Sequence, residues 1–112
     1  EAICRPSAAR VTTLITITLP RWTNPDQGNE KLRSKWLAFR SALERHERAH
    51  QQHAVDAGQR LYDALLALPA APCRELSQQA TALARGIIEQ GQERDAELDM
   101  RTDYGRKEGV KF

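Results

Sequence analysis

The chain has 112 residues, of which 17 are Lys or Arg and 15 are Asp or Glu, so its formal net charge is +2. The nearly balanced charge and the absence of a basic block give no indication of nucleic-acid binding. No apolar run approaches the roughly 20 residues of a membrane-spanning helix. We expect one domain over residues 1–112, and the start at Glu1 suggests the processed or C-terminal part of a longer chain.

Residues 11–19 carry β-branched side chains at most positions, and apolar residues alternate with threonine from Ile15 to Leu19. This alternation is typical of a half-buried strand, which Pro20 would end. A single strand leaves its own hydrogen-bonding groups unpaired. The sequence therefore predicts a small β element near the N-terminus whose partner is not evident.

Two long helices are predicted after this segment. The first runs from about Glu30 to Leu68, with Asp26 or Asn29 as its N-cap and Pro69 beyond its end, and the second begins at Cys73. Apolar side chains and two histidines recur in the first helix in steps of three or four, which predicts a continuous stripe on one face. The stripe consists of Trp36, Phe39, Leu43, His46, His50, Ala54, Ala57, Leu61, Leu65 and Leu68.

The clearest chemical signal is the stretch from His46 to His50, which has the pattern H-E-x-x-H. On a helix, the spacing of four residues brings His46 and His50 one turn apart on the same face, where both imidazoles can bind one Zn²⁺. Glu47 can then act as the general base that takes a proton from a zinc-activated water during peptide-bond hydrolysis. A shared metal would also satisfy two polar groups on the buried stripe.

The same histidines have a simpler interpretation, as hydrogen-bonded core residues or as part of a solvated charged turn. His53, the remaining histidine, lies two turns beyond His46. Three consecutive ligands from one straight helix do not reach a single ion, so we interpret His53 as a residue at the rim of the site.

Cys4 and Cys73 are the only cysteines. Their wide separation and the absence of a C-x-x-C pattern argue against a metal site. Either they close one long loop as a disulfide, which would place the protein in an oxidising compartment, or they are two unpaired buried thiols.

The two helices are predicted to pack as an antiparallel hairpin through a short turn that contains proline. The acidic residues in the second half of the second helix, 89–99, are interpreted mainly as a solvated face. The antiparallel return brings the glycine-punctuated tail, residues 98–112, near His46 and His50. A third zinc ligand can come from this tail.

Three further features accompany the H-E-x-x-H pattern: the segment Ile17-Thr18-Leu19-Pro20-Arg21-Trp22, Cys73, and the tail Asp99-x-x-Thr102-x-Tyr104-Gly105-x-x-x-Gly109. With the approach Trp36…Phe39…Leu43, they resemble a bacterial family of secreted or periplasmic zinc-dependent proteases that is catalogued as a domain of unknown function. The resemblance covers nearly the whole chain. It implies a zincin-like α+β domain, export, a disulfide, and peptidase activity on a substrate that is not known.

The tail of this family carries a histidine before the glycine, a plausible third zinc ligand, and here that position is Tyr104. Tyr104 can bind zinc as a phenolate, donate a hydrogen bond to the tetrahedral intermediate, or be a packing residue in a domain that has lost tight metal binding. Asp99 and Asp103 are alternative oxygen ligands. Asp99 can instead orient a ligand histidine.

We therefore predict a secreted or periplasmic zinc metallopeptidase with a zincin-like α+β fold of two long antiparallel helices and a small N-terminal β element. The predicted metal ligands are His46, His50 and Tyr104, and the predicted catalytic residues are Glu47 and Tyr104. The predicted partner is a peptide or protein substrate. The alternative is a catalytically impaired zincin-like domain that acts as a binding or interaction module.

Overall fold

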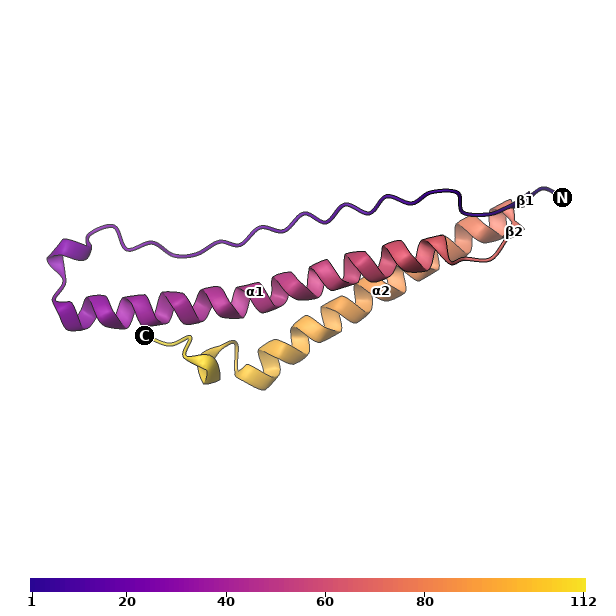
Figure 1. The fold of residues 1–112 in the computed structure, drawn as a ribbon. Helices are drawn as coiled ribbons and strands as arrows, with labels where there is room; N and C mark the ends of the chain where they lie inside the picture. Colours follow the sequence, from indigo (N-terminus) through magenta and orange to yellow (C-terminus); the bar gives the residue numbers. More distant parts are fainter. The chain divides into compact units, whose positions relative to one another are not determined.

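The computed structural model describes every residue from 1 to 112. Its elements, in chain order, are β1 (Ile3–Cys4), the 3-10 helix η1 (Pro25–Gln27), α1 (Glu30–Leu66), β2 (Ala71–Pro72), α2 (Cys73–Thr102) and the 3-10 helix η2 (Arg106–Glu108). Figure 1 shows α1 and α2 as continuous helices. The predicted combination of two long helices with a small N-terminal β element is confirmed. Neither helix has the length and apolar composition that crossing a membrane requires.

The contacts within the chain define two compact units. We call residues 1–14 and 53–94 the disulfide unit, and residues 15–52 and 95–112 the histidine unit. Helices α1 and α2 each contribute to both units.

The start of α1 is fixed by Asn29, one of the two predicted N-caps. Its side-chain Oδ1 accepts a hydrogen bond from the backbone N–H of Leu32 at 2.8 Å, and its carbonyl oxygen accepts one from the N–H of Arg33 at 3.0 Å. The Arg33 guanidinium in turn donates to the carbonyl oxygen of Gly28. The two bonds to Asn29 satisfy N–H groups that a helix start otherwise leaves unpaired, which explains why the helix begins at Glu30.

The strand predicted at residues 11–19 is wrong, because these residues have no strand partner. Figure 1 shows them as an extended chain before η1. The alternation is seen only in the burial of the side chains, because Ile15 and Ile17 are half-buried and Thr16 is exposed. A strand needs a partner as well as a pattern, and the chain offers no second run of this kind.

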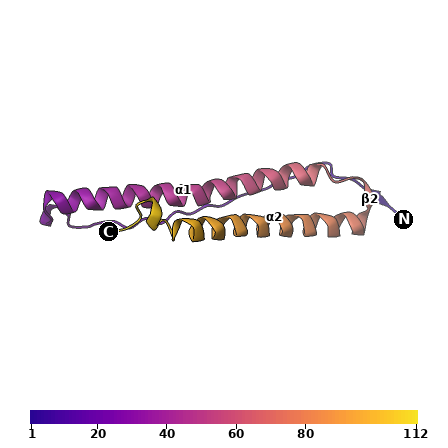
Figure 2. The same cartoon turned by 90° about the horizontal axis from the view of Figure 1, so that it is seen from below.

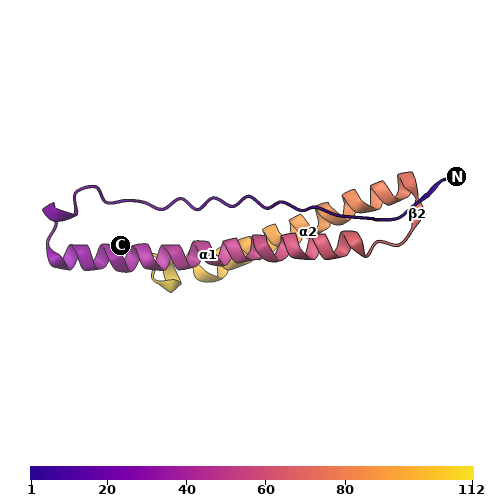
Figure 3. The ribbon, with the colours of Figure 1, turned by 45° about the horizontal axis from the view of Figure 1, so that its top comes forward.

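The β element of the disulfide unit is a two-residue pairing. β1 runs antiparallel to β2, with Ile3 opposite Pro72 and Cys4 opposite Ala71, and Figure 3 shows the two segments side by side near the N-terminus. The backbone N–H of Cys73 donates to the carbonyl oxygen of Ala2 at 3.3 Å. The pairing therefore fixes the N-terminus against the start of α2.

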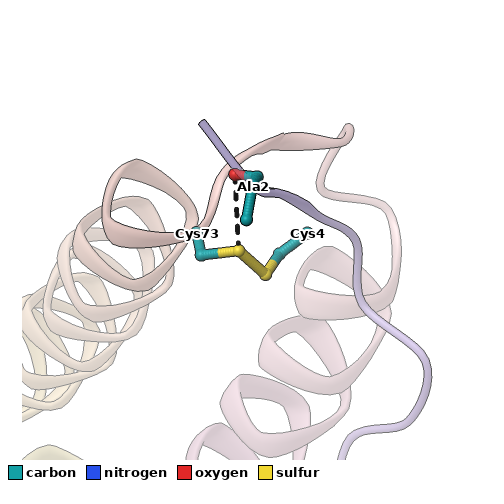
Figure 4. The surroundings of a disulfide bond; sticks show 3 residues. All are labelled: Ala2, Cys4 and Cys73. Atoms are coloured by element: carbon teal, nitrogen blue, oxygen red, sulfur yellow. Dashed lines mark hydrogen bonds between the residues drawn. A yellow bond between two sulfur atoms is a disulfide. The ribbon is translucent and has the colours of Figure 1, made fainter.

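Cys4 and Cys73 form the predicted disulfide, with their Cα atoms 4.8 Å apart. Figure 4 shows the bridge beside the carbonyl oxygen of Ala2, which lies 3.5 Å from Cys73 Sγ. A disulfide sulfur carries no proton, so this approach is a contact and not a hydrogen bond. Because such bridges persist in oxidising environments, the disulfide is compatible with an extracellular or periplasmic location.

We expect the bridge to stabilise the folded protein by about 4 kcal/mol, because it restrains a long loop in the unfolded chain. The two cysteines are 69 residues apart in the sequence. In urea unfolding, the double variant Cys4→Ser/Cys73→Ser should lose this free energy relative to the oxidised wild type. Reduced wild-type protein is the matched control and should unfold like the double variant. Equal stability of the oxidised and reduced proteins would contradict the expectation.

Candidate metal centre

Two histidines of α1 meet at a single oxygen atom of α2. His46 Nε2 and His50 Nε2 each lie 2.8 Å from Oδ1 of Asp99. The two rings have their centroids 4.9 Å apart and stand nearly perpendicular, with an interplanar angle of 84°. The predicted convergence of His46 and His50 is therefore present, and Asp99 lies at the point where their Nε2 atoms converge.

A separate carboxylate holds the other nitrogen of each ring. His46 Nδ1 lies 2.7 Å from Glu108 Oε1, and His50 Nδ1 lies 2.8 Å from Asp95 Oδ1. Because ionised carboxylates only accept hydrogen bonds, each imidazole in this arrangement donates from both nitrogens. The arrangement therefore favours the protonated, cationic form of both rings, in line with their raised pKa.

The proton affinities follow from these contacts. Burial by itself favours neutral His46, which is only 4% exposed, but hydrogen bonds to Glu108 and Asp99 outweigh it and raise the pKa of this imidazole. Burial acts in the same direction on His50, and hydrogen bonds to Asp95 and Asp99 raise its pKa. Burial favours neutral Asp99, but the two imidazoles lower the pKa of this carboxyl.

Matched helical spacing explains how the sequence builds the centre. His46 and His50 are one turn apart on α1, and Asp95 and Asp99 are one turn apart on α2. Residues four apart share a face of a helix, so two such pairs can interlock when the helical segments pack together. Our interpretation of residues 89–99 as mainly a solvated face missed the role of Asp95. The common spacing of the two pairs was the signal that could have revealed it.

The chain makes a tight turn directly after α2. Asp103 and Tyr104 both have positive φ angles, 51° and 55°, which are unfavourable for residues with a Cβ atom. The buried hydroxyl of Thr102 stabilises this turn, because it donates to the carbonyl oxygen of Leu98 at 2.7 Å and accepts from the N–H of Gly105 at 3.0 Å. Figure 2 shows the C-terminal segment, in yellow, continuing beyond the end of α2.

Gly105 is required by the path of this turn. Its φ is +86°, and a Cβ atom at this position would lie 2.6 Å from Val110 Cγ2 and 3.2 Å from His46 Cγ. Only glycine fits this backbone conformation and this close approach. The turn delivers η2 to the histidines and places Glu108 on His46, a contact that the sequence analysis did not foresee. The two glycines that flank η2 were its only signal.

The other predicted site residues lie around this centre. Glu47 is half-buried on α1 between the two histidines in sequence. The side chain of Tyr104 is 67% exposed, while its backbone N–H donates to the carbonyl oxygen of Asp99 at 2.7 Å. Asp103 pairs with Arg106 at 3.2 Å. His53 is half-buried in the disulfide unit.

The donor atoms fit a metal ion such as zinc. His46, His50 and Asp99 offer two imidazole nitrogens and one carboxylate oxygen that all lie within 4.8 Å of one another. Two histidines and one carboxylate form a ligand set that catalytic zinc sites use. A carboxylate on the far nitrogen of each ligand histidine is also typical of metal sites, because it fixes the orientation and tautomer of the ring.

The fold and the site define a class of disulfide-bridged helical proteins in which two histidines gather around one carboxylate. The family described as "Bacterial protein of unknown function (DUF922)" matches residues 1–105, so the chain belongs to this family. The match includes both histidines, Asp95 and Asp99, and it ends before Glu108. Searches of curated proteins and of solved structures found no match.

The metal-free protein should lose stability as the pH rises above 6.5, the ordinary pKa of histidine. Because the pKa of both histidines is raised by folding, the folded state retains protons that the unfolded state releases. Their stabilising contribution is complete below pH 6.5 and disappears as the pH rises through the raised values. The stabilising contribution of Asp99 has the opposite pH dependence, because folding lowers the pKa of its carboxyl. This contribution is present above about pH 4 and is lost as the pH falls.

Urea unfolding of chelator-treated protein, between about pH 5 and about pH 8, measures this dependence. Glu108→Gln should reduce it, because the substitution removes a charge that raises the pKa of His46. Glu44→Gln is the matched control, since Glu44 pairs with exposed Arg48 on the surface of the same helix, where ion pairs contribute little. A pH dependence that is identical in all three proteins would contradict the assignment.

Proposed function

We propose that this protein is a zinc-dependent peptidase of zincin-like fold, in which His46, His50 and Asp99 bind the metal and Glu47 is the general base. The observation that carries the proposal is the meeting of both Nε2 atoms at Asp99 Oδ1. These atoms belong to the H-E-x-x-H pattern predicted to bind zinc and to the acidic residue predicted as one alternative third ligand. The set leaves a coordination position for water, as catalytic zinc sites do.

The surrounding carboxylates would prepare the histidines for this role. A zinc ligand histidine is neutral, so Nε2 of each ring would hold the metal without its proton, while Nδ1–H would continue to donate to Glu108 in His46 and to Asp95 in His50. These hydrogen bonds select the tautomer with a free Nε2 lone pair and raise its basicity. Zinc held there would supply a Lewis acid and lower the pKa of a water molecule.

Glu47 follows His46 directly and precedes His50 by three residues, so it belongs to the same turn of α1 as both ligands. A carboxylate at this place can accept a proton from the attacking water and transfer it to the leaving amine. Tyr104 is part of the strained turn after α2 and has a largely exposed side chain. In this proposal Asp99 takes the third ligand position, and the Tyr104 hydroxyl donates to the oxyanion that forms on the substrate.

The peptidase would act outside the cytosol. The Cys4–Cys73 disulfide fits the periplasm or the extracellular space. A peptide or protein segment is the substrate class implied by a general base beside a catalytic metal.

The second candidate function is a catalytically impaired zincin-like domain that binds a partner. One observation favours it: both nitrogens of His46 and His50 have carboxylate partners without a metal, and no buried side-chain nitrogen or oxygen lacks a hydrogen-bond partner. Such a network can be purely structural. Metal binding and dependence of hydrolysis on Glu47 separate the two candidates.

We expect purified protein to bind close to one zinc ion per chain, because the histidine unit offers one His-His-Asp donor set. His46→Ala, His50→Ala and Asp99→Ala should each abolish tight binding, measured by equilibrium dialysis with metal analysis. Glu44→Gln is the control and should retain zinc, because Glu44 pairs with exposed Arg48 on the same helix and belongs to no candidate donor group. If added zinc neither binds nor raises the melting temperature of the wild type, the peptidase proposal fails.

Two conservative substitutions test the proposed catalytic roles. Glu47→Gln should retain zinc and lower hydrolysis of an unfolded protein substrate by about 10²–10⁴, because it removes the general base. Tyr104→Phe should retain zinc and lower turnover by about 10²–10³, because only a transition-state hydrogen bond is lost. Loss of zinc in Tyr104→Phe would instead make the phenol a ligand. Unchanged hydrolysis in Glu47→Gln would exclude the proposed mechanism.

A further inference from the structure

Both tryptophans and both phenylalanines of the chain gather in one cluster of the histidine unit. Trp36 is at its centre, with ring centroids 6.2 Å from Trp22, 5.7 Å from Phe39 and 6.2 Å from Phe112. None of the four side chains is fully buried, and Phe112 remains 64% exposed. Aromatic rings that stay accessible in a group mark a binding surface more often than a core.

The cluster borders a cavity of about 500 Å³, which is within the range of ligand sites. Its lining residues are Pro20, Arg21, Trp22, Leu32, Trp36 and Phe112. Arg21 is the only charged side chain among them, and the ammonium group of Lys35 lies 5.7 Å from the centroid of the Phe112 ring. The cavity is therefore apolar inside and positively charged at its edge, which suits a bulky apolar side chain next to a carboxylate.

The position of the cavity relates it to the histidines. Leu32 and Phe39 precede His46 by fourteen and seven residues, so the three share one side of α1. Trp36 lies ten residues before His46, or about 15 Å along the helix, and Leu32 about 21 Å. The tail also connects the two places, because Glu108 contacts His46 and Phe112 contacts Trp36.

We propose that this aromatic cavity is a substrate subsite that takes an aromatic or branched apolar side chain, flanked by an acidic residue, four to six residues away from the scissile bond. An extended peptide advances about 3.3 Å per residue, and four to six residues therefore cover the interval between the cavity and the histidines. The location of the scissile bond rests on the proposed peptidase function. Binding of an acidic-aromatic peptide in the cavity does not depend on that function.

Tryptophan fluorescence reports occupation directly, since both tryptophans of the chain border the cavity. The probe is a tryptophan-free synthetic peptide with one Asp-Phe pair in a Gly-Ser background, titrated into the Glu47→Gln variant with and without zinc. It should shift the emission and bind about tenfold to a hundredfold more tightly than the same peptide with Ala in place of Phe, because the ring is buried. Replacing Asp by Lys should weaken binding further.

Two variants locate the binding. Trp22→Ala removes one wall of the cavity from a segment outside the helices, and Arg21→Glu reverses the charge of an exposed side chain without removing apolar contacts. Both variants should bind the Asp-Phe peptide more weakly, and the Arg21→Glu variant should no longer prefer a peptide with Asp over one with Lys. Arg40→Glu is the matched control, since Arg40 is exposed on α1 and does not line the cavity. Equal binding of the Phe and Ala peptides would overturn the subsite.

Cleavage mapping by mass spectrometry with active zinc-loaded protein tests the distance. Moving the Asp-Phe pair by two residues should move the cleavage site by two residues. Peptide binding without any hydrolysis would refute the peptidase and leave the cavity as a peptide site, whereas hydrolysis that ignores the Phe would refute the subsite alone. Emission that changes with protein concentration, together with dimers in sedimentation, would show that a second copy occupies the cavity and would overturn the proposal.

Discussion

The histidine unit depends on one shared oxygen atom. Asp99 Oδ1 holds His46 and His50 together, although the two rings repel each other at this distance when both are protonated. Glu108 and Asp95 supply the remaining negative charge from the outer sides of the rings. Loss of one partner would leave buried His46 incompletely compensated, which is far more costly than loss of a surface ion pair.

The same arrangement would make metal binding depend on the protonation of the two histidines. At low pH both nitrogens of each ring are protonated and donate hydrogen bonds to carboxylates. At higher pH Nε2 loses its proton and has a free lone pair, while Nδ1–H keeps its carboxylate partner. In the proposed function, protons and zinc would therefore compete for one position between the rings and Asp99. The network that links these side chains thus also holds three donor atoms close together, as the proposed metal site requires.

The tail after α2 links the histidines to the aromatic cavity. Its turn contains two residues with positive φ, whose unfavourable conformation is offset by the hydrogen bonds of Thr102 and by the close approach that Gly105 allows. From this turn the tail places Glu108 on His46 and Phe112 on Trp36. A short strained segment thus completes both the polar centre and the apolar pocket.

The sequence by itself determined the features that depend on local spacing: the two long helices, an N-cap at Asp26 or Asn29, and the shared face of His46 and His50. It also restricted the cysteines to one possible bridge. Only the tertiary structure decided which carboxylates meet the histidines, because Asp95, Asp99 and Glu108 lie 45 to 62 residues away in the chain. The strand predicted at residues 11–19 failed for the same reason, since alternation is local whereas a hydrogen-bonded partner must be supplied by another part of the fold.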